Sequence, residues 1–214
     1  MTLDGIIGAL ELHPSAGQRA ALQTYVDLLE RWNGTYNLTG IRERQAMLTQ
    51  HLADCLAVVR PMQKQLAKTV RLLDVGSGAG LPGIVIATML PEYEVTCVDA
   101  VAKKAAFIRQ AAGSMALSNL KSCHGRVEAL RNLQFDAVTS RAVGSLADLV
   151  GLTKPLLAPN GRWMAMKGKV PYDEIADLPA HVDTFHVEQL TVPGLAGERC
   201  LVWMARTDST TPRV

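Results

Sequence analysis

The sequence predicts an α/β protein with a seven-stranded, mostly parallel sheet, an antiparallel edge and a helical extension at the N-terminus. Five short apolar segments alternate with helical segments between residues 70 and 167, a pattern typical of an open parallel sheet with both faces covered. Two further strands follow, separated only by residues 193–197, and a connection this short favours antiparallel pairing. No strand signal precedes residue 68, which indicates that the first part of the chain is helical.

The N-terminal part predicts two helices. Apolar side chains recur at helical spacing within residues 16–33 and again near residues 43–60. We therefore expect a helical extension over residues 1–68, a sheet domain over residues 69–206 and a short tail over residues 207–214.

The remaining elements are predicted from apolar runs for strands and from capped or amphipathic segments for helices. Pro82 suits the start of a helix, where its missing N–H costs nothing, and Ser145 with Asp148 forms a capping-box pattern. The expected strands are residues 70–75, 94–99, 120–123, 135–140, 161–167, 183–192 and 199–205. The expected helices between them are residues 83–90, 102–117, 127–131 and 145–157.

Composition excludes several classes of protein. The 214 residues are 48% hydrophobic and 20% charged, which is globular rather than disordered. A net charge of +2 and 5% aromatic residues argue against a coat for polyanions and against a platform that stacks many bases. No two of the four cysteines lie within four residues, so no local metal site is expected. Three of the cysteines lie in apolar runs, where buried free thiols are expected. Without a basic leader or an apolar run of about 20 residues, we expect a cytoplasmic protein with no membrane segment.

A glycine-rich loop is the strongest local motif. Residues 74–83 (DVGSGAGLPG) join the first strand of the sheet to its first helix, and Gly76, Gly78 and Gly80 allow a sharp turn and a close ligand approach. Asp99 ends the second strand, where a carboxylate can accept both hydroxyls of a ribose. Together these features predict a cofactor that carries adenosine.

Two cofactors fit this pattern. Residues 78–83 spell G-x-G-x-x-G, which a dinucleotide-binding protein also carries. However, Asp74 would place a negative charge against a pyrophosphate, whereas S-adenosylmethionine has no phosphate and carries two cationic groups. We therefore favour S-adenosylmethionine over a nicotinamide dinucleotide. In the simpler alternative, Asp74 only caps the loop by accepting from its amides.

Two more segments at the predicted carboxyl edge bear on the ligand. After the third strand, Val127 can pack on an adenine and Glu128 can accept from its amine, although Glu128 also suits an ordinary helix start. After the fourth strand, the chain lacks both the Pro-Pro motif of amino-group methyltransferases and a nearby cysteine nucleophile. Arg141, and Lys167 at the end of the fifth strand, suggest an anionic or acceptor-rich substrate. The alternative for Lys167 is an ordinary surface lysine.

These motifs, in this order, resemble one family. The sequence is similar to the glucose-inhibited division protein B family (RsmG), bacterial methyltransferases of 16S ribosomal RNA, over residues 20–205. The combination of W-N-x-x-Y-N-L-T with D-V-G-S-G-x-G-L-P-G is specific, and Ser77, Ala79 and Cys55 are small-for-small departures. The matching segments are Trp32-Asn33, Tyr36-Asn37-Leu38-Thr39, His51, Asp54, residues 74–83, Arg126-Val127-Glu128, Ser140-Arg141-Ala142, Lys167-Gly168 and Gly197-Glu198-Arg199.

The resemblance implies a class I (Rossmann-like) methyltransferase that transfers a methyl group from S-adenosylmethionine to guanine N7 at position 527 of 16S ribosomal RNA in the small subunit. It implies cofactor contacts from the glycine loop, from the turn after the third strand and from the fourth strand end. The cofactor-binding residues are therefore predicted to be Gly76, Gly78, Gly80, Leu81, Asp99, Val127, Glu128 and Arg141, of which Asp99 follows from its place at the strand end.

The implied chemistry needs no general base, because guanine N7 already presents a lone pair, and we assign no catalytic acid, base or metal ligand. Arg141 and Lys167 are expected to position RNA or guanine acceptors. Asn37 either faces the cofactor pocket or is only a turn residue. Two other functions stay open: a non-enzymatic RNA-binding assembly factor on the same fold and, less favoured, an NAD-dependent oxidoreductase.

Overall fold

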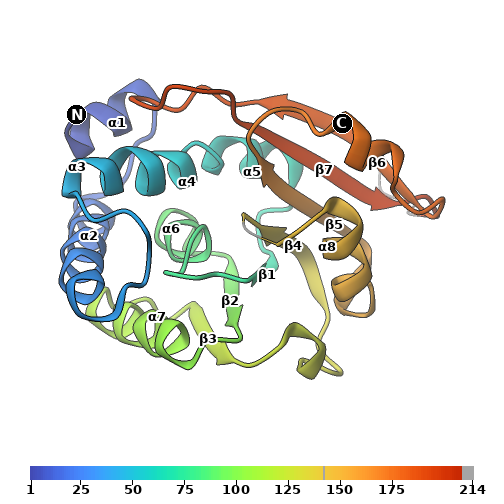
Figure 1. The fold of residues 1–214 in the computed structure, drawn as a ribbon, viewed down its shortest axis with the longest axis horizontal. Coiled ribbons are helices and arrows are strands. Elements are labelled where there is room, and N and C mark those ends of the chain that lie inside the picture. Colours follow the sequence, from blue (N-terminus) through green and yellow to red (C-terminus); the bar gives the residue numbers. More distant parts are fainter. Residues whose placement is uncertain (142, 209–214) are drawn as a thin grey trace.

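The centre of the protein is one seven-stranded sheet with the strand order β3-β2-β1-β4-β5-β7-β6. The computed structural model describes residues 1–141 and 143–208, so Ala142 and residues 209–214 of the predicted tail lie outside the described residues. Figure 1 shows the sheet with helices around it. The strands are β1 (Arg71–Val75), β2 (Glu94–Asp99), β3 (Leu120–His124), β4 (Phe135–Ser140), β5 (Leu157–Lys167), β6 (Val182–Gln189) and β7 (Cys200–Arg206).

Strand pairing confirms the predicted fold class. The pairs among β1 to β5 are parallel, and β7 pairs antiparallel with both β5 and β6. Two strand ends differ from the sequence prediction by more than one residue. β5 begins at Leu157 rather than 161, because Leu157 lies opposite Phe135 on β4 before a register shift. β6 ends at Gln189 rather than 192, where Gln189 still pairs with Cys200.

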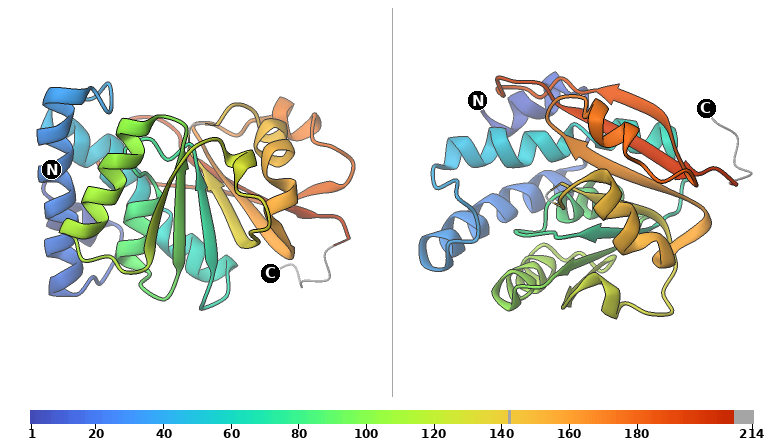
Figure 2. Two further views of the ribbon diagram at one scale, coloured as in Figure 1. Left: turned by 90° about the horizontal axis from the view of Figure 1, so that it is seen from below. Right: turned by 45° about the vertical axis from the view of Figure 1, so that its right-hand side comes forward.

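Helices cover both faces of the sheet, as the alternation of elements predicts. On one side lie α2 (Ala16–Tyr36), α6 (Gly83–Met89) and α7 (Ala102–Ser114), and on the other lies α8 (Leu146–Thr153) (Figures 1 and 2). Ser145 and Asp148 form the expected capping box at the start of α8. Other short helical segments are α1 (Leu3–Ala9), η2 (Val127–Ala129), η3 (Lys154–Leu156) and α9 (Tyr172–Ala176).

Two hydrophobic clusters fill the space between sheet and helices. Successive strand residues alternate between them: Leu72 packs in the cluster on the α6 side and Leu73 in the cluster on the α8 side. The same alternation places Met164 in the first cluster and Trp163 in the second. This pattern is the period of two expected of a strand buried on both faces.

The second predicted helix, near residues 43–60, is instead a series of short segments. It contains α3 (Arg44–Met47), a π-helical segment η1 (Leu48–Ala53) and α4 (Asp54–Leu56), and α5 (Val59–Gln65) follows a turn. The apolar face is buried at Leu52, Cys55 and Val59 and half-buried at Leu48, so the periodicity of the sequence could not distinguish a π segment from an α-helix. Segments of this kind are often found at functional sites.

The N-terminal helices share the hydrophobic cluster on the α6 side of the sheet. Leu22 and Leu52 are fully buried in the same cluster as Leu72 and Ile84. The Tyr25 hydroxyl of α2 donates a 2.9 Å hydrogen bond to the carbonyl of Ala79 in the glycine loop. The helical region therefore supports the loop directly, while the division at residue 68 stays a prediction.

All four cysteines are free thiols, and Cys55, Cys97 and Cys200 are buried as expected. Within the described ranges, no helix has the length and apolar character needed to cross a membrane.

Candidate active site

The predicted site residues gather at one edge of the sheet. Strands β3, β2, β1, β4 and β5 are neighbours and run parallel, so their carboxyl ends meet at this edge. Ligands of open α/β sheets bind at this edge. The glycine loop follows β1, Asp99 ends β2, Val127 and Glu128 follow β3, Arg141 follows β4, and Lys167 ends β5.

The glycine loop needs glycine for its backbone conformation. Gly76, Gly78 and Gly80 have φ angles of 67°, 58° and 82°, a region that side-chain-bearing residues rarely adopt. A Cβ atom on Gly80 would also lie 2.3 Å from Ile84 Cδ1. The geometry of the turn therefore depends on both backbone freedom and close packing against α6.

Most amides of this loop already have acceptors inside the protein, with Ala79 as the exception. A pyrophosphate bound at a helix start needs several N–H groups that point at the ligand. In the described loop most of these groups are bound elsewhere, so the loop is poorly arranged for a dinucleotide and suits a cofactor without phosphate. Gly76 N and Ser77 N donate to Val98 O, Gly78 N donates to Asp99 Oδ2, and Gly80 N and Leu81 N donate to Ser77 O.

Asp74 caps the loop rather than facing a ligand. Its side chain is fully buried, and Oδ2 accepts a 2.9 Å hydrogen bond from Gly83 N at the start of α6. Burial raises the pKa of Asp74 to about 6, although the Gly83 amide opposes this shift. The structure thus supports the simpler interpretation of Asp74, and the loop amides, not this charge, argue against a dinucleotide.

Asp99 joins the loop to the end of β2. Its Oδ2 accepts from Gly78 N and its Oδ1 from Val101 N, both at 2.8 Å, and the residue is 6% exposed. Each carboxylate oxygen has a second lone pair, so these bonds leave acceptor capacity for the ribose hydroxyls. Asp99 can therefore both shape the loop and hold the cofactor.

The turn after β3 lies next to Asp99. Gly125 N donates a 3.0 Å hydrogen bond to Asp99 O, which fixes the start of this turn against β2. Val127 is buried and Glu128 is exposed. Because η2 has only three residues, a helix dipole gives little reason for an acid at Glu128. The predicted contacts to adenine remain compatible with this geometry.

A buried carboxylate joins two arginines beside the loop. Asp54, only 4% exposed, lies between Arg141 and Arg199, with Oδ2 3.5 Å from Arg141 Nη1 and Oδ1 3.2 Å from Arg199 Nε. Arg141 Nη1 also lies 3.4 Å from Nδ1 of His51. Burial and the Arg141 charge lower the pKa of His51 to about 4, so this imidazole is neutral near pH 7.

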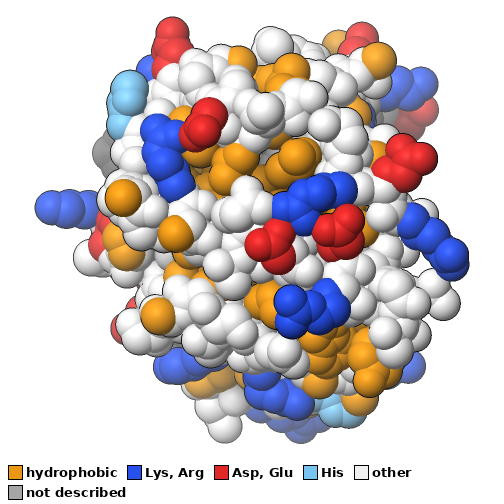
Figure 3. All heavy atoms as spheres, turned by 90° about the vertical axis from the view of Figure 1, so that its left-hand side faces the viewer, with side chains coloured by type: hydrophobic (Ala, Val, Ile, Leu, Met, Phe, Trp, Pro, Cys, Tyr) orange, Lys and Arg blue, Asp and Glu red, His pale blue; other side chains and the backbone are white. Residues whose placement is uncertain are grey.

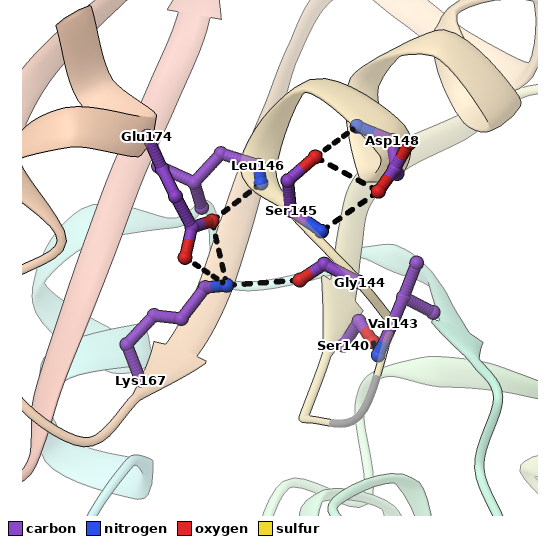
Figure 4. Close-up of polar contacts among 8 residues, drawn as sticks. All are labelled: Ser140, Val143, Gly144, Ser145, Leu146, Asp148, Lys167 and Glu174. Atoms are coloured by element: carbon purple, nitrogen blue, oxygen red, sulfur yellow. Dashed lines mark hydrogen bonds and ion pairs between the residues drawn. The ribbon is translucent and has the colours of Figure 1, made fainter. Parts of the chain in front are cut away.

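Lys167 is held in a network rather than open to solvent. Its Nζ lies 2.8 Å from Glu174 Oε2 and 3.0 Å from the Gly144 carbonyl, and its side chain is 18% exposed (Figure 4). Glu174 also accepts from Leu146 N at the start of α8. Lys167 therefore connects β5, α9 and the segment that follows Arg141. Lys167 is therefore neither a solvated surface lysine nor a cation without a partner. Its role toward RNA stays a prediction.

Asn37 ends α2 in the left-handed conformation, with φ of 47°. Its side chain is exposed and accepts a 3.0 Å hydrogen bond from Arg42 Nη2. These contacts are those of a turn residue, and a cofactor role for Asn37 stays a prediction. The neighbouring Asn33 holds the same loop from a buried position, through bonds to Thr39 N and Ile41 O.

Comparison with known proteins identifies the chain. Residues 18–202 match the family rRNA small subunit methyltransferase G (GidB). The chain belongs to this family. A relative named ribosomal RNA small subunit methyltransferase G, from Methylibium petroleiphilum, is 55% identical over 199 residues, which cover 92% of this chain and 90% of the relative. The resemblance drawn from the motifs is thereby confirmed, as are the predicted methyltransferase class and its cofactor, S-adenosylmethionine.

Solved structures confirm the fold shared with other methyltransferases. A SAM-dependent methyltransferase from Aquifex aeolicus aligns with a TM-score of 0.55 at 14% identity, covering 74% of this chain and 92% of that one. TrmN from Thermus thermophilus aligns with a TM-score of 0.56 at 18% identity, covering 71% of this chain and 48% of that one. At these identities the likeness concerns the α/β fold alone.

The sequence pattern of this family member indicated no role for His51, Asp54 or Arg199, although all three lie in segments that resemble the family. His51 and Asp54 interrupt an otherwise apolar helical face, which was the available signal. Arg199 lies 145 residues from Asp54, so its contact could not be found from local spacing.

Proposed function

We propose that the protein transfers a methyl group from S-adenosylmethionine to N7 of guanine 527 in 16S ribosomal RNA of the bacterial small subunit. The observation that carries this proposal is its membership in the rRNA small subunit methyltransferase G family over residues 18–202. Relatives more than half identical carry names that specify small-subunit ribosomal RNA. Such a substrate places the protein in the cytoplasm, with the small subunit as its partner.

The carboxyl edge of the sheet suits the cofactor. Gly76, Gly78, Gly80 and Leu81 form the loop against which it would lie, and the amides of these four residues already have acceptors within the protein, which suits a ligand without phosphate. Asp99 has acceptor capacity for the ribose, while Val127 and Glu128 would contact the adenine. Arg141, beside the loop, would complete this set.

The reaction requires the protein to align the guanine with the cofactor, and it requires no proton transfer before the methyl group moves. When bound, S-adenosylmethionine supplies a methyl group on a positively charged sulfur. Guanine N7 presents its lone pair in the neutral base, so no side chain has to remove a proton first. Holding N7 in line with the methyl carbon can itself supply much of the acceleration. We therefore assign positioning roles to Arg141, Lys167 and Asn37, and no catalytic acid or base.

Radiolabelled methyl transfer tests the proposal. Small subunits from a strain that lacks the enzyme are incubated with labelled S-adenosylmethionine and the purified protein, and the labelled nucleoside is identified. N7-methylguanosine at one position is the expected product. Tight binding to the subunits without transfer would instead indicate an assembly factor. Calorimetric titration with NAD serves as the control for the oxidoreductase alternative and should give no binding.

A further inference from the structure

A small cavity lies beside the carboxyl ends of β4 and β5. Its volume is about 360 Å³, and its polar wall is formed by His51, Asp54, Arg141 and Arg199. These side chains come from η1, α4, the end of β4 and the residue before β7. Three separate parts of the chain therefore meet at this cavity.

The side chains that line the cavity carry a net positive charge, although buried Asp74 also attracts Arg141 from outside the lining. Asp54 is one carboxylate between two guanidinium groups, and His51 is neutral near pH 7. Lys167 also lines the cavity, but Glu174 pairs with it. Among the described residues that line the cavity, Asp54 is the only acid, so one positive charge remains. A partly buried charge of this kind is stabilised by an anion.

The geometry leaves guanidinium donors available to an anion. Asp54 binds Nη1 of Arg141 and Nε of Arg199, and the Glu198 carbonyl accepts from Nη1 of Arg199. Nη2 of either arginine meets no acceptor in residues 1–141 and 143–208. The carboxylate thus orients two guanidinium groups while leaving donors for a ligand. Arginine is the side chain best suited to phosphate oxygens.

We propose that this cavity binds a phosphodiester of the RNA strand next to the target guanine, and that Asp54 is the positioning residue that holds Arg199 for it. Arg141, on the other oxygen of Asp54, borders both this cavity and the proposed cofactor site. The inference rests on the proposed function and names the part of the substrate that this subsite takes. A phosphodiester fits better than the carboxylate of the cofactor, because Arg199, Met166 and Gly168 place the cavity toward β5 and β7. The predicted adenosine site lies in the other direction, at β1 to β3.

A local subsite matters for this protein because its surface offers little diffuse attraction for RNA. The net charge is only +2. In the middle of the face over α2 and α3, basic and acidic side chains are interspersed (Figure 3). Each well-placed phosphate contact therefore contributes a large share of the salt-dependent binding.

The test measures binding of small subunits from a strain that lacks the enzyme, across a salt series, for wild type and variants. Arg199→Ala should weaken binding about ten-fold at 0.1 M salt and make the log–log salt slope shallower by about one. Arg60→Ala is the matched control, because Arg60 is exposed on α5, where it pairs with Glu11, and its slope should equal that of wild type. Calorimetry with S-adenosylmethionine should give wild-type affinity for Arg199→Ala.

Asp54→Asn separates positioning from simple charge. Removing an acid raises the positive charge of the cavity, so charge alone predicts tighter RNA binding, whereas loss of positioning predicts weaker binding. We expect weaker binding. If Asp54→Asn does not fold, Arg199→Lys is the variant to use. Lysine keeps the positive charge but lacks the planar set of guanidinium N–H donors. RNA binding should therefore weaken while the salt slope stays near that of wild type.

Three outcomes would overturn the inference. An unchanged salt slope in Arg199→Ala would mean that no phosphate binds there. Loss of cofactor affinity in place of RNA affinity would assign the cavity to the carboxylate of the cofactor. Tighter binding by Asp54→Asn would remove the positioning role. Failure of the proposed function would be seen separately, as wild-type protein that binds subunits but transfers no methyl group.

Discussion

Protonation of His51 should make the protein lose stability in mild acid. The imidazole is 8% exposed, Nε2 has no hydrogen-bond partner among the described residues, and burial with the Arg141 charge lowers its pKa from 6.5 to about 4. Between these two values the unfolded state binds more protons than the folded state, so stability falls as the pH falls. The full difference corresponds to about 3 kcal/mol, of which about 2 kcal/mol is lost between pH 7 and pH 5.

His51→Gln isolates this contribution, because glutamine cannot take up a proton in this range. Urea unfolding at several pH values between 7 and 4.5 gives the free energy of unfolding for both proteins. Other groups that titrate, including Asp74, contribute equally to both curves and cancel in the difference. The difference should change by about 2 kcal/mol from pH 7 to pH 5 in favour of the variant. His13→Gln is the control, since His13 is exposed, and it should leave the wild-type curve unchanged. If the free energy of unfolding of wild type and of His51→Gln changed with pH in parallel, the inference that His51 is a neutral imidazole in the folded protein would be wrong.

Four further predictions concern the site. Asp99→Asn should weaken S-adenosylmethionine binding about ten- to hundred-fold in calorimetry without unfolding the chain, because it loses charge-assisted hydrogen bonds to Gly78 and to the ribose; unchanged affinity would place the ribose elsewhere. Single-turnover methyl transfer at saturating RNA should vary little between pH 7 and pH 8.5, because N7 needs no deprotonation, and a steep rise would reveal a general base. Lys167→Ala should lower the free energy of unfolding by about 1 kcal/mol, as should Glu174→Ala, with the double variant less than additive. Lys167→Ala should leave the salt slope of RNA binding unchanged, because its ammonium group already has acceptors, and a shallower slope would instead assign it a phosphate contact.

The arrangement of the sheet could be predicted from the sequence because its signals are local. Each strand is an apolar run of a few residues, and the glycine loop, Asp99 and Arg141 all adjoin strand ends. Once the strands are parallel neighbours, their carboxyl ends must share an edge. The gathering of these residues therefore followed from order along the chain and from sheet geometry alone.

Contacts between segments far apart in the chain could not be predicted from the sequence. The pairing of Asp54 with Arg199 depends on how the helical region docks, and no local pattern encodes that docking. Lys167 could not be recognised as partnered, because Glu174 lies on a short helix that the sequence analysis did not expect. Asp74 illustrates a third limit: its position in the loop was clear, but its complete burial was decided by packing against α6.

The hydrogen bond from Tyr25 to Ala79 makes α2 part of the same thermodynamic unit as the glycine loop. A ligand that favours the ordered loop must also favour the docked helix, and linkage requires the reverse effect to be equal in size. Cofactor binding should accordingly slow hydrogen exchange in α2, far along the chain from the residues that touch the ligand. Detaching α2 would raise the dissociation constant of the cofactor even though every loop residue is retained.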